Sequence, residues 1–248
     1  MFKDLFSNHA SAYAKYRPTY PEELFAFLAA QSPHHHRAWD CATGNGQAAR
    51  SLVDYFAEVV ATDASAKQLE HAAAHPKIKY LVAPAESCPE IAANSIDLIT
   101  VASAIHWFNF EKFYDEVRRV LRPGGVIAAW VFRETDEHRE FDQVLRKFQK
   151  EILGPYWPEE TQKWIMTEYK TLPFPFTEIK SPEFRVNVEW TAEDALGYLA
   201  TWSATPRYIA ERKQNPLDLI REDLIRSVQN EGGLVRRGWK LILKVGRL

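Results

Sequence analysis

The chain has 248 residues, of which 46% are hydrophobic, and a formal net charge of −2 at pH 7. This is enough for one large domain with a substantial core, or for a domain with a sizeable insertion. A pI near 6.5 gives no electrostatic basis for binding nucleic acid or an anionic membrane. Two cysteines, no bilayer-length apolar run and a polar start unlike a secretory signal lead us to expect a cytoplasmic protein.

Residues 1–36 are predicted to form a helical lid. Pro21 followed by two glutamates is typical of a helix start. The Tyr-rich turn before it is either a surface connection or a lid in which Tyr13 and Arg17 donate to a ligand carboxylate. We predict no metal site at the triplet 34–36, because three consecutive histidines cannot easily converge on one ion.

From residue 37 to 132 the pattern alternates between apolar strands and helices. Strands are predicted at 37–41, 58–63, 78–82, 96–101 and 126–132, and helices at 47–56, 65–74 and 110–121. Nearly continuous apolar strands separated by helices indicate an α/β fold, with a parallel sheet covered on both faces. Its crossover connections should be right-handed.

The rhythm changes after residue 133. Helices are predicted at 137–152, around Trp164, and at 191–202 and 217–229, with strands at 184–190 and 239–245. We expect the helices to fold over the ligand edge of the sheet and the two late strands to complete it. The predicted organisation is thus a lid (1–36), a cofactor-binding core (37–132) and a helical substrate cover with the last two strands (133–248).

Residues 38–47 join the first predicted strand to the next helix. They run through Asp40 into a turn of small residues at 42–46, and Gln47 opens the helix. Small residues let the backbone approach a ligand closely, and such a turn points N–H groups at the ligand. In open α/β sheets, ligands bind beyond the carboxyl ends of the strands. The stretch therefore predicts a nucleotide-type cofactor site.

Two cofactors fit this stretch. Gly44–Ala49 matches a dinucleotide pattern, and Asp63 lies where a ribose-binding acid is expected. Asp40 favours a different cofactor, because a carboxylate there would repel a pyrophosphate. The same carboxylate suits the methionyl ammonium of S-adenosylmethionine, whose ribose hydroxyls Asp63 can accept. An NAD-dependent oxidoreductase is the less favoured alternative.

The ordered motifs of residues 37–132 resemble those of class I S-adenosylmethionine-dependent methyltransferases. They are Asp40-x-Ala42-Thr43-Gly44-Asn45-Gly46, Asp63, Ala85-Glu86, Ser95–Ile99, Ala104–Phe108 and Leu121–Gly125, with Ala42 where the family usually has glycine. The segments Tyr16–Pro21, His106–Phe108, Thr201–Ser203 and Lys244–Arg247 resemble the type 11 group, which includes trans-aconitate methyltransferase-like proteins. The resemblance implies a Rossmann-like, doubly wound sheet of seven strands, mostly parallel with the last antiparallel, plus a helical cover over the ligand edge.

The resemblance also implies roles for individual residues. Asp40 would orient the ammonium, Asp63 would accept the ribose hydroxyls and Glu86 would meet the adenine edge. The expected cofactor-binding residues are Tyr13, Arg17, Asp40, Ala42, Gly44, Gly46, Gln47, Asp63, Ala64, Ala85, Glu86, Ala102 and Ser103. Structural alternatives stay open for the three acids: a turn cap, a helix cap and an exposed loop acid, respectively.

His106 follows the fourth strand and would face the methyl donor. It is either a general base for a hydroxyl or amine, or a packing residue beside Trp107. The expected substrate-pocket residues are Trp107, Tyr156, Trp157 and Trp202, with core packing as the alternative. We expect a methyltransferase acting on a small molecule at a carboxylate or other oxygen and releasing S-adenosyl-L-homocysteine. A catalytically silent cofactor-binding module is another possibility, and monomer and homodimer both stay open.

Overall fold

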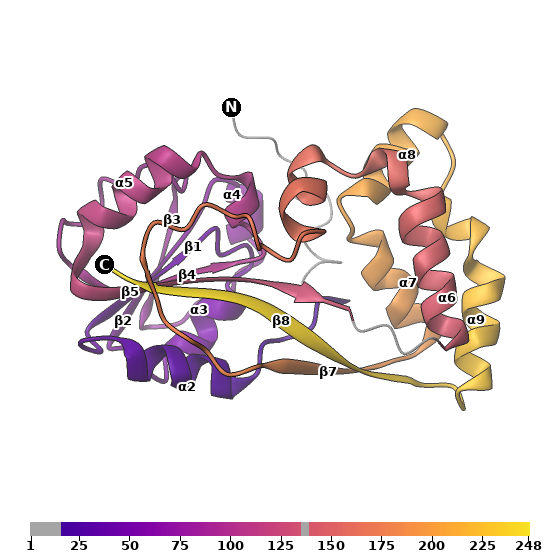
Figure 1. Cartoon of the computed structure of the whole chain (residues 1–248), viewed down its shortest axis with the longest axis horizontal. Helices are drawn as coiled ribbons and strands as arrows, with labels where there is room; N and C mark the ends of the chain where they lie inside the picture. Colours follow the sequence, from indigo (N-terminus) through magenta and orange to yellow (C-terminus); the bar gives the residue numbers. More distant parts are fainter. Residues whose placement is uncertain (1–15, 135–138) are drawn as a thin grey trace.

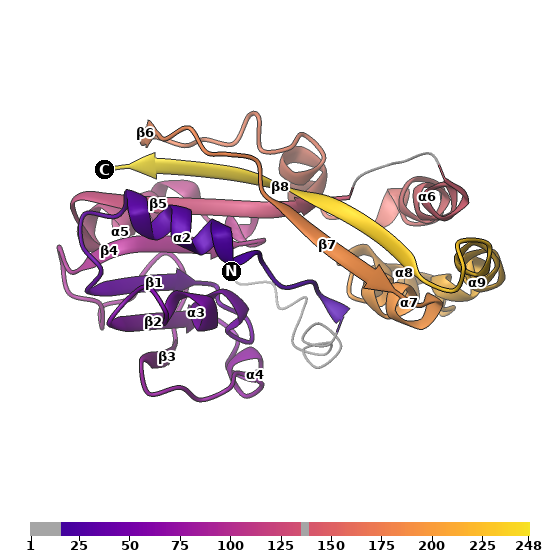
Figure 2. The same ribbon diagram turned by 90° about the horizontal axis from the view of Figure 1, so that it is seen from below.

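The computed structural model of the chain describes residues 16–134 and 139–248, and one mixed sheet forms its centre (Figures 1 and 2). The strands are β1 (Arg37–Cys41), β2 (Glu58–Asp63), β3 (Ile78–Val82), β4 (Ile96–Ala102), β5 (Leu121–Arg133), β6 (Thr177–Glu178), β7 (Arg185–Trp190) and β8 (Val235–Arg247). The α-helices are α2 (Glu22–Gln31), α3 (Gln47–Leu52), α4 (Ala66–Leu69), α5 (Phe110–Val120), α6 (Glu140–Arg146), α7 (Ala192–Ala200), α8 (Ala204–Arg212) and α9 (Arg221–Asn230). Short 3₁₀ or π segments are η2 (Ile105–Trp107), η3 (Lys147–Ile152), η4 (Gly154–Tyr156), η5 (Thr161–Ile165) and η6 (Pro216–Leu219).

The strand order is β3-β2-β1-β4-β5-β8-β6, and β7 also pairs with β8. Strands β1 to β5 pair in parallel, whereas β8 runs antiparallel to β5, β6 and β7. The predicted α/β sheet, mostly parallel with an antiparallel last strand, is therefore confirmed. The sheet has one strand more than the seven expected. The additional strand is β6, whose two residues are too few to show an alternating pattern in the sequence.

Each face of the sheet has its own apolar core. In β1, Ala38 packs with α2 and α3 on one face, while its neighbour Trp39 packs with α5 on the other. Successive strand side chains point to opposite faces, so a strand covered on both sides must be apolar throughout. Helices α2 and α3 contribute Leu28 and Leu52 to the first core, and α5 contributes Val117 to the second.

Several predicted helices differ from the observed ones. The helix expected at 65–74 ends at Leu69, because residues 70–74 are mostly exposed and no packed apolar face sustains it. The helix expected at 217–229 is divided into the 3₁₀ segment η6 and α9. Helix α8 was missed altogether. No helix among the described residues is long and apolar enough to cross a bilayer.

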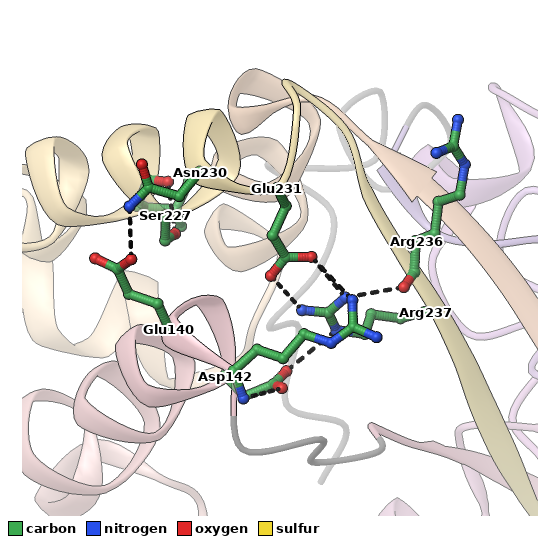
Figure 3. Close-up of polar contacts among 9 residues, drawn as sticks. Glu140, Asp142, Ser227, Asn230, Glu231, Arg236 and Arg237 are labelled. Carbon is green, nitrogen blue, oxygen red and sulfur yellow. Dashed lines mark hydrogen bonds and ion pairs between the residues drawn. The ribbon is translucent and has the colours of Figure 1, made fainter.

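Helices α6, α7, α8 and α9 gather at one end of the molecule, away from β1, β2 and β3 (Figure 1). Arg237, near the start of β8, joins two of them (Figure 3). Its guanidinium donates to Oδ1 of Asp142 at 3.3 Å in α6, and to both carboxylate oxygens of Glu231 at 2.8 and 2.9 Å just after α9. These hydrogen bonds hold the pKa of Glu231 below its usual range. The Arg237 side chain is 1% exposed, so the cluster is an internal joint between helices and sheet.

Candidate active site

The turn between β1 and α3 has left-handed backbone. Its φ angles are +55° at Ala42, +58° at Gly44 and +85° at Gly46. At Gly46 only glycine fits, because an added Cβ would lie 2.6 Å from the hydroxyl of Tyr80. Ala42 adopts the same region with a side chain, which is unfavourable for an L-residue. The family difference noted at Ala42 therefore falls on a strained position.

Asp40 lies beneath this turn rather than in the wall of a cavity. Its Oδ1 accepts a hydrogen bond from the hydroxyl of Thr100 in β4 at 2.7 Å. Its Oδ2 accepts from the hydroxyl of Thr43 and from the backbone N–H of Ala49 in α3, the latter at 3.1 Å. Burial raises the pKa of Asp40 to about 6. The structure thus shows Asp40 in the turn-capping position, where these donors draw its carboxylate inward, and its role toward a ligand ammonium stays a prediction.

Asp63, at the end of β2, faces the same turn from the other side. Its Oδ2 accepts the backbone N–H of Gly44 at 2.9 Å, and its Oδ1 accepts that of Ser65 at 2.8 Å. The N-cap of α4 is Ser65, whose hydroxyl accepts the N–H of Gln68. The two carboxylate oxygens of Asp63 thus hold backbone N–H groups of the turn and of the segment leading into α4.

A cavity of about 990 Å³ lies over the carboxyl ends of β1, β2, β3 and β4. We call it the main cavity. It brings together most of the predicted residues: Ala42, Gly44, Gln47, Asp63, Ala64, Ala85, Glu86, Ala102, Ser103, His106 and Trp107. Gly46 forms the N-cap of α3 behind the turn and is not among its lining residues. Tyr13 lies outside the described residues.

The main cavity also includes residues that the motifs did not indicate. Gln68 is 6% exposed, and its Oε1 has no hydrogen-bond partner within residues 16–134 and 139–248. This oxygen lies 3.9 Å from where a Cβ on Gly44 would be. A buried acceptor without a donor is unfavourable unless a ligand supplies one. The only hint of Gln68 in the sequence was its position in the first turn of the helix that follows Asp63.

Glu86 connects two loops at the edge of the main cavity. Its Oε1 accepts the backbone N–H of Asn109 at 2.9 Å, just before α5. The side chain is half-buried, so it is not simply an exposed loop acid. Together with Ala85 it places a carboxylate and an apolar wall beyond the end of β3.

His106 lies in η2, immediately after β4, and is 3% exposed. Its Nδ1 is 3.0 Å from the hydroxyl of Tyr169, and its ring centroid is 4.7 Å from that of Trp107. Burial lowers the pKa of His106 to about 3, so the ring is neutral at neutral pH. The geometry allows both the packing role and contact with a ligand.

A second cavity of about 100 Å³, which we call the inner chamber, adjoins the main cavity. Arg17, Trp157 and Trp202 line this chamber and not the main cavity. The Arg17 guanidinium donates to the hydroxyl of Thr201 at 3.0 Å and to its carbonyl at 3.3 Å. Arg17 therefore lies apart from the glycine turn, and its contact with a ligand carboxylate stays a prediction.

Tyr156 was predicted in the substrate pocket but lies in neither cavity. Its hydroxyl accepts a hydrogen bond from Nε of Arg212 at 2.6 Å, and its ring packs 4.8 Å from that of Tyr208. It is 7% exposed and belongs to the core. The core-packing alternative applies to it, because α8 covers the ring.

Comparisons with known proteins give consistent matches. The family described as methyltransferase domain matches residues 39–129. A candidate methyltransferase of Dictyostelium discoideum is 30% identical over 236 residues, covering 94% of this chain and 89% of that protein. An uncharacterised methyltransferase of Mycobacterium tuberculosis is also 30% identical over 236 residues, covering 92% and 90%.

One solved structure is similar over nearly its whole length. It is a candidate type II methyltransferase from Anaeromyxobacter dehalogenans, with a TM-score of 0.82 and 35% identity, covering 93% of this chain and 97% of that one. These matches exclude the alternative of an NAD-dependent oxidoreductase. Motif order, fold and relatives agree: the chain is an enzyme that belongs to the class I S-adenosylmethionine-dependent methyltransferases.

Proposed function

We propose that the main cavity binds S-adenosylmethionine and that the enzyme methylates a small molecule at an oxygen atom, a carboxylate or another oxygen nucleophile. The single observation that carries the proposal is the arrangement of Asp63 around the turn. Its carboxylate braces Gly44 and still faces the main cavity. The narrower resemblance to trans-aconitate methyltransferase-like proteins stays a prediction.

The donor set of the main cavity fits this cofactor. Asp63 would accept the ribose hydroxyls, and Ala85 with Glu86 would hold the adenine side. The unpartnered Oε1 of Gln68 supplies an acceptor near Gly44 for a further hydroxyl or ammonium donor. Bound there, the cofactor would supply an activated methyl group on a sulfonium.

The chain's own contribution to the reaction is positioning and exclusion of water. Methyl transfer requires alignment of donor and acceptor more than acid–base assistance. Trp164 and Lys163 of η5 close one side of the main cavity, and Trp107 stands between the two cavities. A volume of about 990 Å³ is in the range of small-molecule sites, which favours a small acceptor over a polymer.

The role of His106 would depend on whether the methyl acceptor is a carboxylate or a hydroxyl. A carboxylate acceptor is already ionised and needs only to be oriented. A hydroxyl acceptor must lose a proton, and Nε2 of His106 is the ring nitrogen not in contact with Tyr169. Because burial lowers the pKa of His106 to about 3, its neutral imidazole is a weak base; it would orient the hydroxyl through Nε2, and the proton released on methyl transfer would pass to solvent.

Calorimetric titration with S-adenosylhomocysteine tests cofactor binding directly. We expect saturable binding by the parent and loss of at least tenfold in affinity for Asp63→Ala, since a charge-assisted hydrogen bond contributes about 1.5–3 kcal/mol. The exposed acid Asp54, changed to Ala, is the matched control and should bind as the parent does. No binding by the parent would overturn the proposal. Binding without methyl transfer to any oxygen acceptor in a broad panel would support the silent module instead.

A further inference from the structure

The inner chamber is built as an extension of the main cavity. Ser103, His106 and Trp107 line both. Its volume of about 100 Å³ is below the roughly 150 Å³ of a cavity that holds a benzene ring. The chamber therefore holds a group smaller than a ring, while the remainder of a bound molecule extends past Ser103 into the main cavity.

The walls of the chamber combine aromatic, aliphatic and polar side chains. The rings of Trp157 and Trp202 are 5.3 Å apart, and the rings of Tyr198 and Trp202 are 5.8 Å apart and nearly perpendicular, at 82°. Phe132 and Ile165 add apolar surface, and Gln149 and Ser203 add polar groups. A wall of this kind suits a group with both an apolar and a polar part.

Two hydroxyl oxygens at this chamber have no hydrogen-bond partner among the described residues. Thr161 in η5 is 3% exposed, and its Oγ1 is buried and unpartnered. The Oγ of Ser103 is in the same situation where the chamber meets the main cavity. A buried hydroxyl without a partner destabilises the free protein. Both oxygens would be satisfied by a polar group held in the chamber.

The charges at the chamber oppose each other. The Arg17 guanidinium lies 5.0 Å from the centre of the Tyr198 ring, and the hydroxyl of Tyr198 donates to Oε1 of Glu134 at 2.7 Å. A carboxylate in the chamber would be attracted by Arg17 and repelled by Glu134. An ammonium would be repelled by Arg17 and attracted by Glu134. An ionised group would therefore lose its hydration without one dominant countercharge. An uncharged group avoids this cost.

We infer that the inner chamber is the acceptor subsite and selects an uncharged group carrying a hydroxyl, which Thr161 hydrogen-bonds. This inference rests on the proposed function and narrows its oxygen acceptor from a carboxylate to a hydroxyl. Thr161 is a positioning and specificity residue, since it touches the acceptor and not the main cavity. Ser103 provides the second hydroxyl at the boundary.

Phenol and benzoate are matched probes, because they share a ring and differ in charge. Their affinities are measured by saturation-transfer NMR titration of the full-length protein saturated with S-adenosylhomocysteine. We expect saturable phenol binding and at least tenfold weaker benzoate binding. Thr161→Val keeps the shape of the side chain and removes the hydroxyl, so it should weaken phenol binding about fivefold to tenfold.

Stability provides an independent readout. Because the Thr161 hydroxyl has no partner in the free protein, Thr161→Val should leave the Tm equal to or above that of the parent. A Thr with only a structural hydrogen bond would lose stability instead. Thr167→Val is the control, since that exposed hydroxyl donates to the carbonyl of Lys163 at 2.7 Å and lines neither cavity. It should leave phenol affinity unchanged.

The outcomes separate this inference from the proposed function. Benzoate binding as tightly as phenol, no saturable phenol binding, or unchanged phenol affinity in Thr161→Val would each overturn the inference. In all three cases, binding of S-adenosylhomocysteine by the parent would leave the proposed function standing. Failure of the parent to bind S-adenosylhomocysteine overturns the proposed function itself.

Discussion

The hydroxyl of Thr100 in β4 donates a 2.7 Å hydrogen bond to Oδ1 of Asp40 in the neighbouring strand β1. Burial raises the folded-state pKa of Asp40 from 3.8 to about 6. Between these values the folded protein binds more protons than the unfolded chain. The contribution of Asp40 to the free energy of unfolding is therefore present below pH 4 and declines as the pH rises to about 6.

Asp40→Asn removes this titration while keeping the shape of the side chain. The free energy of unfolding of the parent, relative to that of the variant, should fall by about 2 kcal/mol from pH 4 to pH 6 and level off near pH 7. Urea denaturation at pH 4, 5, 6 and 7 measures it. A difference that does not vary with pH would show that Asp40 keeps its ordinary pKa in the fold.

Opposite substitutions in the glycine turn should have opposite effects. Ala42→Gly relieves a side chain at φ +55° and should raise the free energy of unfolding by about 1 kcal/mol, or the Tm by about 2–4 °C. Gly44→Ala introduces the same strain at φ +58° and should lower stability by a similar amount. Its Cβ would contact only Oε1 of Gln68, at 3.9 Å, so backbone strain is the cause. Scanning calorimetry of both variants measures the change in Tm. A change of the same sign in both would contradict the prediction.

His106 should make the fold sensitive to mild acid. Burial lowers its pKa from 6.5 to about 3, so below pH 6.5 the unfolded chain binds a proton that the folded protein does not. The free energy of unfolding therefore falls as the pH decreases, by about 2 kcal/mol at pH 5 relative to pH 8. His106→Gln retains a polar group for Tyr169 and should lose this component. Urea titrations of both proteins at pH 8 and pH 5 measure it; parallel changes would refute the assignment.

Two adjacent arginines of β8 should differ sharply in importance (Figure 3). Arg237→Met leaves the carboxylates of Glu231 and Asp142 without their main partner and should cost about 3 kcal/mol. Arg236→Met breaks an ion pair with Glu189 in which the side chains are 66% and 63% exposed, and should cost below about 1 kcal/mol. Urea denaturation compares the two. Similar losses would mean that the buried cluster does not anchor α6 and α9.

The sheet follows from the sequence to a large extent. The predicted ranges 37–41, 58–63 and 78–82 coincide with β1, β2 and β3. These strands have short, mostly apolar patterns bounded by turns and an acid, and those signals are local. The helices after residue 133 are not bounded by such local signals. Helix α8 begins four residues after α7 ends, and no glycine or proline between them marks the end of one helix and the start of the next.

The candidate site could be predicted as a set of strand-end residues, but the direction of each side chain could not. Asp40 and Asp63 both lie at the carboxyl ends of their strands, and both carry a carboxylate. Only the three-dimensional positions of Thr100 and Ala49 turn Asp40 inward and leave Asp63 at the main cavity. The unpartnered oxygens of Gln68 and Thr161 were equally invisible, since the lack of a partner is a property of the packed structure.

The position of β8 between β5 and the pair β6 and β7 has a consequence for synthesis on the ribosome. Strands β1 to β5 can pair with one another once residues up to 133 have emerged. Among the described strands, β6 and β7 pair with β8 alone, so both must wait, with their hydrogen-bonding edges open, until residues 235–247 are made. In the nascent protein, strands β1 to β5 are therefore assembled while β6 and β7 are still exposed. That interval is when a chaperone would protect the chain most.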